Sequence, residues 1–297
     1  MKQDERTDFY KEIASNKRKS WLLLAIVLVI LSAIVYVFSM IYGIGILFIG
    51  GVFIIVYSLV GYYYGDKIVL KATNARPVNE KNVKELQFKN IVETLSFATR
   101  IPEPKAYVIE NEDLNAFATG RDPEHSSVAI TTGLLNKLNR DEIEGVVAHE
   151  LSHVANYDVR YGTIVAVMVG LVAILSSIFL RVNFFSGSNN KKGNGLAILI
   201  IVGIILAIIS PIIVRIVQAS ISRKREFLAD ASGARITRYP EGLARALEKI
   251  KGTNKGNLKV SEAVSHLFFD DPVKSHLDGL FSTHPPIDER IKMLRSM

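Results

Sequence analysis

Two histidines four residues apart, with a glutamate beside the first, offer the clearest chemistry in the sequence. They are His149, Glu150 and His153, within the stretch VVAHELSHVAN at 146–156. On a helix, positions i and i+4 share one face about one turn apart, so two imidazoles can hold one metal ion. A carboxylate one position after the first ligand reaches water on such an ion without binding the ion itself. The spacing therefore predicts a catalytic metal site with Glu150 as general base.

The nature of the metal follows from the ligands that the chain can supply. The sequence contains no cysteine, so any metal must be bound by nitrogen and oxygen. Three such ligands and one open position suit a single zinc ion best, though chemistry alone leaves other divalent ions open. The alternative is a solvated helix that carries histidines by chance. Its apolar neighbours, Val146, Val147, Leu151 and Val154, indicate burial instead, and burying these polar groups without partners is costly.

A third ligand must come from elsewhere in the chain. Glu226 and Asp230 are again four residues apart, among small residues that allow close helix packing. Glu226 as ligand and Asp230 as acceptor for a ligand histidine form a coherent pair. The alternative for this stretch is an exposed turn with local ion pairs. His276 and His284 are the rival ligands.

Apolar residues are concentrated in runs that are long enough to cross a membrane. No charged residue lies between Lys19 and Asp66, a stretch more than twice the roughly 20 residues that one transmembrane helix needs. A pair of glycines near its middle allows a turn. We therefore expect a hairpin of two spans at 21–64, and a second hairpin at 161–219 from two further uncharged runs. A cleaved secretory signal, the alternative for the first run, has a much shorter apolar core.

The distribution of lysine and arginine predicts the orientation in the membrane. The first twenty residues contain six of them, whereas the first turn between spans has none. Because positive charge is retained inside, residues 1–20, 65–160 and 220–297 are expected in the cytoplasm, in a multi-pass protein of the cell membrane. Both termini and the metal site are then cytoplasmic. Nucleic-acid binding is not expected, because the basic residues at 222–226 lie beside a span, where topology requires them.

The cytoplasmic segments contain short predicted elements. Helical periodicity covers 79–99, and a proline begins another helix at 240–251. Three β-prone segments separated by turn residues predict a small meander or hairpin; they are 105–110, 115–120 and 126–131. Neither cytoplasmic segment carries an obvious core alone, so we expect one domain built from both. The expected fold is mainly α with a small β-sheet.

The helix that carries the histidines is expected to begin at Asn139, which is followed by acidic residues. We expect it to continue through 157 into the third span at Tyr161. His153 then lies roughly 12 Å from the membrane boundary, and Glu226, on a helix continuing from the fourth span, lies at matching depth.

Four stretches of the sequence together resemble the HtpX-type membrane zinc metalloproteases, relatives of the CaaX prenyl proteases. The stretches are NAFATG, HELSHVANYD, SRKREFLADA and STHPPIDERI, in the family's order and spacing over nearly the whole chain. The resemblance implies four transmembrane helices and a cytoplasmic zincin-like (gluzincin) metalloprotease domain built from two chain segments. It also implies zinc ligation by His149, His153 and Glu226, with Glu150 as base.

The resemblance assigns roles to further residues. Asp230 and Asp158 are expected behind the ligands, Asp158 in a structural role, and Arg290 is expected to be a structural anchor. His284 is expected to be catalytic and to stabilise the oxyanion. His125 matches no catalytic position and is expected in a surface loop. The residues expected to line the substrate cleft are Asn115, Ala116, Phe117, Ala118 and Thr119.

The expected function is cleavage of unfolded or damaged membrane and cytosolic proteins, that is, membrane protein quality control under stress. An extended polypeptide substrate adds a strand at a sheet edge, for which NAFATG or SSVAIT is suited. A CaaX-like processing protease is the second enzymatic reading, disfavoured because four spans leave no evident large chamber. A membrane scaffold or transporter with a structural metal is the third. A transporter is disfavoured because the spans have no ionisable residue at mid-bilayer, and a structural metal site would have little use for Glu150.

Overall fold

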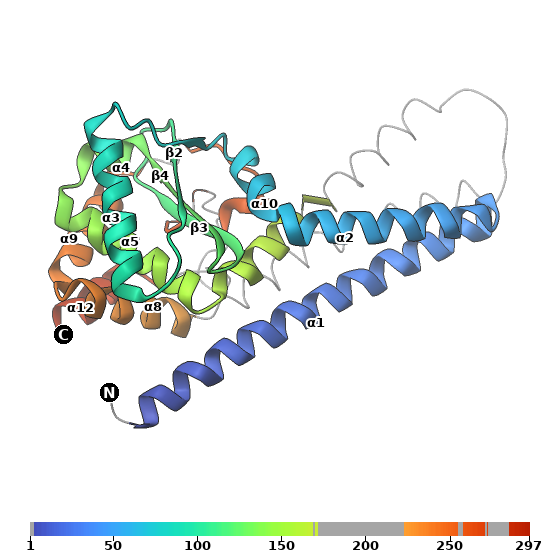
Figure 1. Ribbon diagram of the computed structural model, residues 1–297, viewed down its shortest axis with the longest axis horizontal. Coiled ribbons are helices and arrows are strands. Elements are labelled where there is room, and N and C mark those ends of the chain that lie inside the picture. The colour runs from blue at the N-terminus through green and yellow to red at the C-terminus, as the bar shows by residue number, and fades with distance from the viewer. Residues whose placement is uncertain (1–2, 169, 172–222, 255–257, 271, 273–284) are drawn as a thin grey trace.

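Two long helices extend away from a body of shorter helices around a small sheet (Figure 1). The structure is a computed structural model that describes residues 3–168, 170–171, 223–254, 258–270, 272 and 285–297. The long helices are α1 (Gln3–Tyr42) and α2 (Gly45–Ala72), which pack against each other as a hairpin. The turn between them contains Gly43, whose φ of +93° is readily adopted only by glycine.

The α2 helix is long and apolar enough to cross a membrane, and no other helix among the described residues meets that test. Only 11% of its apolar stretch is buried, and large side chains such as Phe48, exposed at 73%, suit contact with lipid. The first part of the expected hairpin 21–64, up to residue 42, lies within α1. The third span is described only up to residue 171, and the fourth lies outside the described residues. The number of four spans therefore stays a prediction.

The sheet has the strand order β1-β2-β4-β3. Its strands are β1 (Arg76–Pro77), β2 (Lys105–Ile109), β3 (Ala116–Asp122) and β4 (His125–Thr131). The expected hairpin is present, because β3 and β4 pair antiparallel. The meander is wrong, because β4 lies between β2 and β3 and runs parallel to β2. Strand β3 is consequently at an edge of the sheet.

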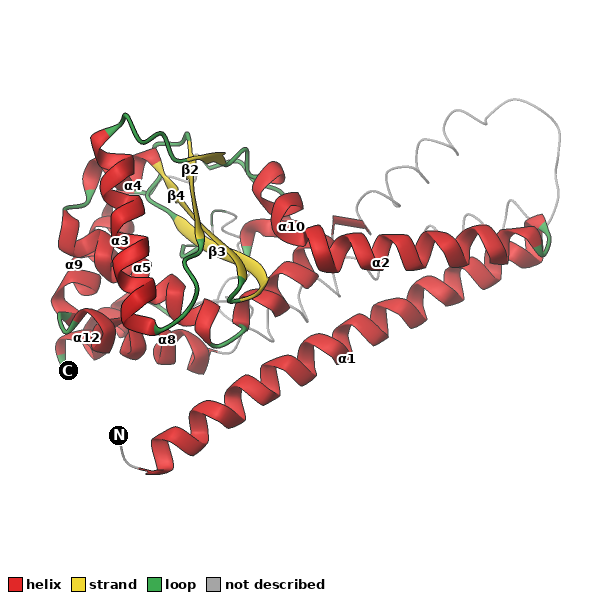
Figure 2. Cartoon of the chain, in the orientation of Figure 1, coloured by secondary structure: helices red, strands yellow, loops and turns green. Residues whose placement is uncertain are grey.

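The two faces of the sheet carry different partners, as the alternation of side chains along each strand requires (Figure 2). On one face Val108, Val128 and Ile130 join a core with helices α3 (Val83–Thr99) and α5 (Arg140–Ala155). On the other face Phe117 and Ala129 pack against the end of α2 and the segment 258–268. The sheet thus connects the candidate membrane span to the rest of the body.

The shorter helices supply the remainder of the core, and α5 and α3 are among those that contact the sheet. They are α3 (Val83–Thr99), α4 (Thr132–Lys137), α5 (Arg140–Ala155), α8 (Arg223–Thr237), α9 (Pro240–Thr253), α10 (Glu262–Ser265) and α12 (Ile287–Arg295). The main core combines both halves of the chain, for example Phe88 and Val147 with Leu243 and Leu294. Helix α5 lies in its middle, against α3, α8 and α9.

Helix α5 begins where the sequence predicts. Asn139 accepts a hydrogen bond from the backbone of Glu142, whose carboxylate accepts one from the backbone of Asn139, at 3.0 and 2.8 Å. This reciprocal capping box satisfies two backbone donors at the helix start. Helix α9 likewise begins at Pro240, as expected.

The end of α5 differs from the prediction of a helix continuous with the third span. The helix ends at Ala155, Tyr157 has a left-handed φ of +62°, and a new helical segment occupies 158–168. The interruption has a physical consequence for the metal site. In an unbroken helix, positions five apart lie about 140° apart around the axis. The break instead returns Asp158 to within 3.0 Å of His153.

Candidate metal centre and pocket

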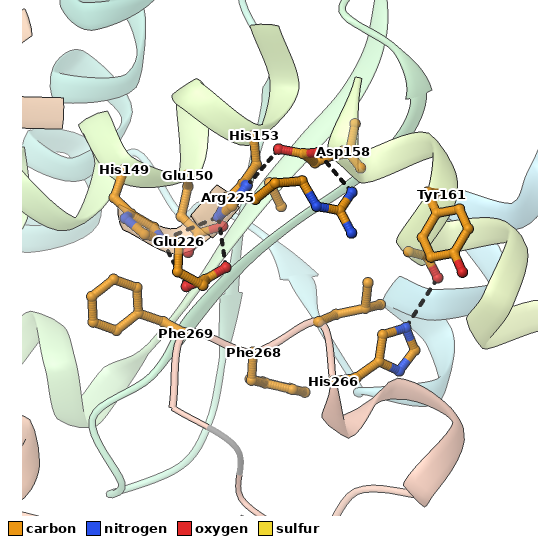
Figure 3. A pocket seen from close by; sticks show the side chains of 14 residues that line it. His149, Glu150, His153, Asp158, Tyr161, Arg225, Glu226, His266, Phe268 and Phe269 are labelled. Carbon is orange, nitrogen blue, oxygen red and sulfur yellow. Dashed lines mark hydrogen bonds and ion pairs between the residues drawn. The ribbon is translucent and has the colours of Figure 1, made fainter. Parts of the chain in front are cut away.

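Three potential ligands converge from two helices (Figure 3). The Nε2 atoms of His149 and His153, both on α5, are 3.1 Å apart. The carboxylate of Glu226, on α8, lies 3.6 Å from the first of these atoms and 3.4 Å from the second. One ligand atom from each of the three residues lies within 4.8 Å of the others. The group expected from the sequence is therefore assembled in space.

The outer nitrogens of both imidazoles face carboxylates. The Nδ1 of His149 lies 2.9 Å from Asp230, and the Nδ1 of His153 lies 3.0 Å from Asp158. A carboxylate accepts hydrogen bonds, so each neutral imidazole carries its hydrogen on Nδ1 and directs the lone pair of Nε2 inward. Two lone pairs 3.1 Å apart repel each other unless a metal ion or an additional proton lies between them. The arrangement therefore favours cation binding.

Close packing of α8 on α5 brings the acidic residues to the histidines. A Cβ atom added to Gly233 would lie only 3.1 Å from the backbone nitrogen of His149. Glycine at this position allows the two helix backbones to approach, and Glu226 and Asp230, one turn apart on α8, then face α5. The small residues around these two acids predicted this close approach.

Asp230 is held by a buried arginine from the C-terminal helix. The guanidinium of Arg290, on α12, donates two hydrogen bonds of 2.7 and 2.8 Å to the carboxylate of Asp230. Both side chains are at most 1% exposed. Burial alone raises the pKa of Asp230, but Arg290 and His149 outweigh burial and lower this pKa to about 2. Asp230 thus stays ionised and can orient His149.

Electrostatics on the other side of the site also favour a positive charge. Burial lowers the pKa of His153, but hydrogen bonds to Asp158 and Glu226 raise it overall, well above its ordinary value. The second oxygen of Asp158 accepts a hydrogen bond of 3.0 Å from Arg225. Without a metal ion, these carboxylates therefore favour the protonated form of His153.

A pocket opens beside these ligands, and Glu150 lines it (Figure 3). The side chain of Glu150 is buried and comes from the same helix as both histidines. The residues that line the pocket are Ala118, His149, Glu150, His153, Asp158, Val159, Tyr161, Gly162, Arg225, Glu226, His266, Leu267, Phe268 and Phe269. A buried carboxylate beside a cation site is placed to accept a proton from water in the pocket.

One wall of the pocket comes from a segment that the sequence did not point to. His266 is buried with its Nε2 atom 3.2 Å from the carbonyl of Gly162. Phe269 contacts the ring of His149, with centroids 4.9 Å apart, and also lies under the guanidinium of Arg290. None of these residues has a recognisable metal-ligand spacing. The only available signal was that His266 is one of six histidines in the chain.

The same segment occupies the strand edge that was expected to receive substrate. The amide of Asn115 bonds the backbone of Asp270 at 2.6 and 3.1 Å, and Phe117 forms an antiparallel bridge with Phe268. Phe269 donates a backbone hydrogen bond of 2.8 Å to Ala116.

The remaining residues expected in the substrate cleft have different surroundings. Thr119 bonds Thr163 at 2.8 Å, and of residues 115–119 only Ala118 lines the pocket. The alternative prediction, that SSVAIT forms the edge strand that receives substrate, is wrong, because β4 is paired on both sides.

The other histidines considered from the sequence are accounted for separately. His276 and His284 lie outside the described residues, so their roles as rival ligands or as catalytic residue stay predictions. His125 is exposed at the β3–β4 turn and bonds Asp122 at 2.7 Å, which is the position expected for a surface loop histidine.

Comparison with known proteins assigns the chain to a family. The model of peptidase family M48 matches residues 82–297. A protease HtpX homolog of Thermoanaerobacter pseudethanolicus is 43% identical, covering 98% of this chain and 99% of its own. Homologs of the same name from Dictyoglomus thermophilum and Streptococcus pneumoniae are 41% and 38% identical, each covering 97% of this chain, and 95% and 99% of their own.

Among solved structures, the crystal structure of S. mikatae Ste24p gives a TM-score of 0.49 at 19% identity, covering 95% of this chain and 66% of that one. The family match covers more than half of the chain, and the relatives align over nearly its full length. The chain therefore belongs to peptidase family M48 and is a membrane metalloendopeptidase of the HtpX type.

Proposed function

We propose that the chain is a zinc endopeptidase in which His149, His153 and Glu226 bind one zinc ion and Glu150 is the general base. The observation that carries the proposal is the convergence of three ligand atoms within 4.8 Å, beside a buried glutamate that lines the same pocket. Catalytic zinc sites typically have three protein ligands and leave the fourth position to water.

The donor set fits zinc in type and in spacing. Bonds of about 2.0–2.1 Å in a tetrahedron place neighbouring ligand atoms roughly 3.3 Å apart. The two Nε2 atoms are 3.1 Å apart, close to that value. One oxygen of the Glu226 carboxylate lies 3.4 Å from the Nε2 of His153, and the other oxygen lies 3.6 Å from the Nε2 of His149. Two imidazoles and one carboxylate, in a chain without cysteine, are also the ligands of a common class of zinc peptidase.

The residues around the zinc position have different roles in peptide hydrolysis. Zinc, when bound, polarises the scissile carbonyl and lowers the pKa of water in the site. Glu150 accepts the proton of the attacking water and passes it to the leaving amine. Asp230 and Asp158 keep the Nε2 lone pairs of both histidines directed inward, because each accepts a hydrogen bond from Nδ1. His284 remains our proposal for oxyanion stabilisation.

The proposed substrates are extended segments of unfolded or damaged membrane and cytosolic proteins. An extended peptide that pairs with β3 is recognised mainly through its backbone, which gives broad specificity. Residues 115–119 would contact it after the segment 267–270 moves from the edge of β3. Val69 and Leu70, at the end of α2, pack under the sheet, so the pocket stays close to the candidate span.

The proposed placement puts residues 1–20, the metal site and both termini in the cytoplasm, with the hairpins 21–64 and 161–219 in the membrane. The rings of Trp21 on α1 and Tyr62 on α2 stack at 5.8 Å. Such amphipathic rings favour the headgroup layer, and this supports a membrane boundary just beyond residue 20. The protease domain is then formed by 65–160 together with 220–297.

Two alternatives are compared with this proposal. A scaffold or transporter with a structural metal does not agree with membership of a peptidase family. A CaaX-like processing protease is a related activity, and a prenylated peptide tests it. The proposal predicts that an unfolded reporter is cleaved faster than a prenylated peptide of matched length.

The proposal is tested with the full chain in detergent. The zinc-loaded protein should cleave an unfolded reporter, the chelator-stripped protein should not, and zinc should restore cleavage. Glu226→Gln should lower zinc affinity by at least about 10-fold. Unchanged affinity in this variant would favour His276 or His284 as ligand. A fully zinc-loaded protein that leaves unfolded and membrane substrates intact would refute the endopeptidase function.

A further inference from the structure

The N-terminal helix α1 places one polar side chain against the metal-binding helix. Asn16 is only 1% exposed, whereas its neighbours Arg18 and Lys19 are exposed. Burying an amide costs free energy unless its donors and acceptor are paired. Asn16 lies five positions before Trp21, and therefore on the cytoplasmic side of the proposed membrane boundary, close to it.

The amide of Asn16 is paired with groups that surround the metal ligands. Its Nδ2 donates to Asp158 at 2.8 Å and to the backbone carbonyl of Asn156 at 3.1 Å. Its Oδ1 accepts a hydrogen bond of 3.3 Å from Arg225, which is adjacent in sequence to Glu226. One side chain thus connects α1 to the end of α5 and to the start of α8.

Asp158 transmits this contact to a ligand. One of its oxygens accepts hydrogen bonds from Asn16 and Arg225, and the other lies 3.0 Å from the Nδ1 of His153. A carboxylate held at one oxygen has fewer orientations available at the other. The partners of a ligand histidine set its ring orientation and basicity, and losing such a partner typically costs about 10–100-fold in metal affinity.

The amide of Asn16 forms specific hydrogen bonds that simple packing does not require. An apolar side chain would fill this buried position equally well. The next buried residue on the same face is Ser20, and among the described contacts its hydroxyl bonds only the carbonyl of Asn16. The amide is instead aimed at the residue pair that flanks the site, Asp158 and Arg225. It also bonds the backbone at the break after α5, where the chain turns back toward His153.

We propose that Asn16 is a positioning residue for His153, acting through Asp158, so that the membrane-proximal part of α1 completes the zinc site. This inference rests on the proposed zinc ligation. Binding of zinc and ordering of α1 around Asn16 are then coupled, and such coupling is reciprocal.

The test uses the full chain in detergent and two variants of Asn16. Asn16→Ala removes the amide, and Asn16→Leu removes it but keeps the volume. Zinc affinity is measured by competition with a chelator, and the thermal stability of the zinc-free protein is measured in parallel. Both variants should lower zinc affinity by about 3–10-fold, less than loss of a direct partner of the ligand. Ser20→Ala is the matched control and should leave zinc affinity unchanged.

A double-mutant cycle separates positioning from packing. If Asn16 acts through Asp158, Asn16→Ala should have little further effect on zinc affinity in a chain that already carries Asp158→Ala. Restored affinity in Asn16→Leu, or effects that add independently of Asp158, would overturn the inference and leave a packing role.

A measurement on the unmodified chain covers the case in which the variants do not fold. Hydrogen exchange at residues 14–22 should slow when zinc is added, because zinc stabilises the network that holds this segment. Exchange that is unaltered by zinc would overturn the inference. Failure of the unmodified chain to bind zinc would instead refute the proposed zinc site, so the two failures are distinguishable.

Discussion

The ion pair between Arg290 and Asp230 predicts a large and separable effect on stability. Arg290→Met replaces the guanidinium by an apolar chain of similar length and leaves the buried carboxylate of Asp230 without its cation. The pair is joined by two hydrogen bonds of 2.7 and 2.8 Å, and neither side chain is more than 1% exposed. Removing one partner of such a buried pair costs about 3–5 kcal/mol.

The expected change in melting temperature follows from this cost. A loss of 1 kcal/mol lowers the Tm of a body of this size by roughly 2–4 °C, so Arg290→Met should lower it by roughly 6–20 °C. The assay is thermal unfolding of the zinc-free protein in detergent. Arg295→Met is the matched control on α12, because Arg295 forms ion pairs at the surface and is 42% exposed. Exposed pairs contribute little, and the Tm of the control should change by no more than about 2 °C.

Two further variants test the cause of the loss. Arg290→Lys keeps the charge but not the paired hydrogen bonds, so its Tm should be intermediate. The double variant Arg290→Met with Asp230→Asn should be more stable than Arg290→Met alone, because the buried charge of Asp230 is removed together with its main partner. A Tm for Arg290→Met within about 2 °C of the unmodified protein would refute the reasoning. So would a double variant that is less stable than the single one.

The remaining predictions concern helix packing and pH. Gly233→Val should separate α8 from α5, because a Cβ atom at Gly233 lies 3.1 Å from the backbone of His149. The variant should lose about 1–3 kcal/mol of stability, measured by unfolding, and should bind zinc more weakly, measured by chelator competition. Gly252→Ala, which meets no atom within 4 Å, is its control, and equal effects of both would contradict the packing argument. Arg76 lowers the pKa of Glu85, so the stability gained from this pair is present above the ordinary pKa of the carboxyl group and is lost as pH falls below it. The Tm advantage of the unmodified zinc-free protein over Glu85→Gln should therefore shrink between pH 7 and pH 3, and an advantage that grows would contradict the assignment.

The local signals in the sequence predicted the elements that carry the ligands. Asn139 followed by acidic residues predicted the start of α5, because a helix cap depends only on neighbouring residues. The spacing of His149 and His153 placed both on one helix face, and the structure brings Glu226 to them. The hairpin of β3 and β4 was likewise predicted from short-range turn and strand signals.

Features that depend on distant contacts were not predictable in the same way. No glycine or proline marks the break after α5 at Tyr157 in the sequence. The left-handed backbone conformation of Tyr157 depends on surrounding contacts. The parallel pairing of β2 with β4 joins strands that are not adjacent in sequence. The wall around Phe269 and the contact of Asn16 with Asp158 unite segments more than a hundred residues apart, and no periodicity reports such contacts.

The role of Glu150 tests the central claim most directly. Zinc-loaded Glu150→Gln and the unmodified protein are compared in detergent, with zinc content and cleavage of an unfolded reporter measured on the same samples. The account predicts equal zinc content and a loss of cleavage of about 100-fold or more, because general-base catalysis typically contributes about 10²–10⁴-fold. Equal cleavage by both proteins would contradict Glu150 as the base, and loss of zinc from the variant would show that Glu150 holds the metal site together instead.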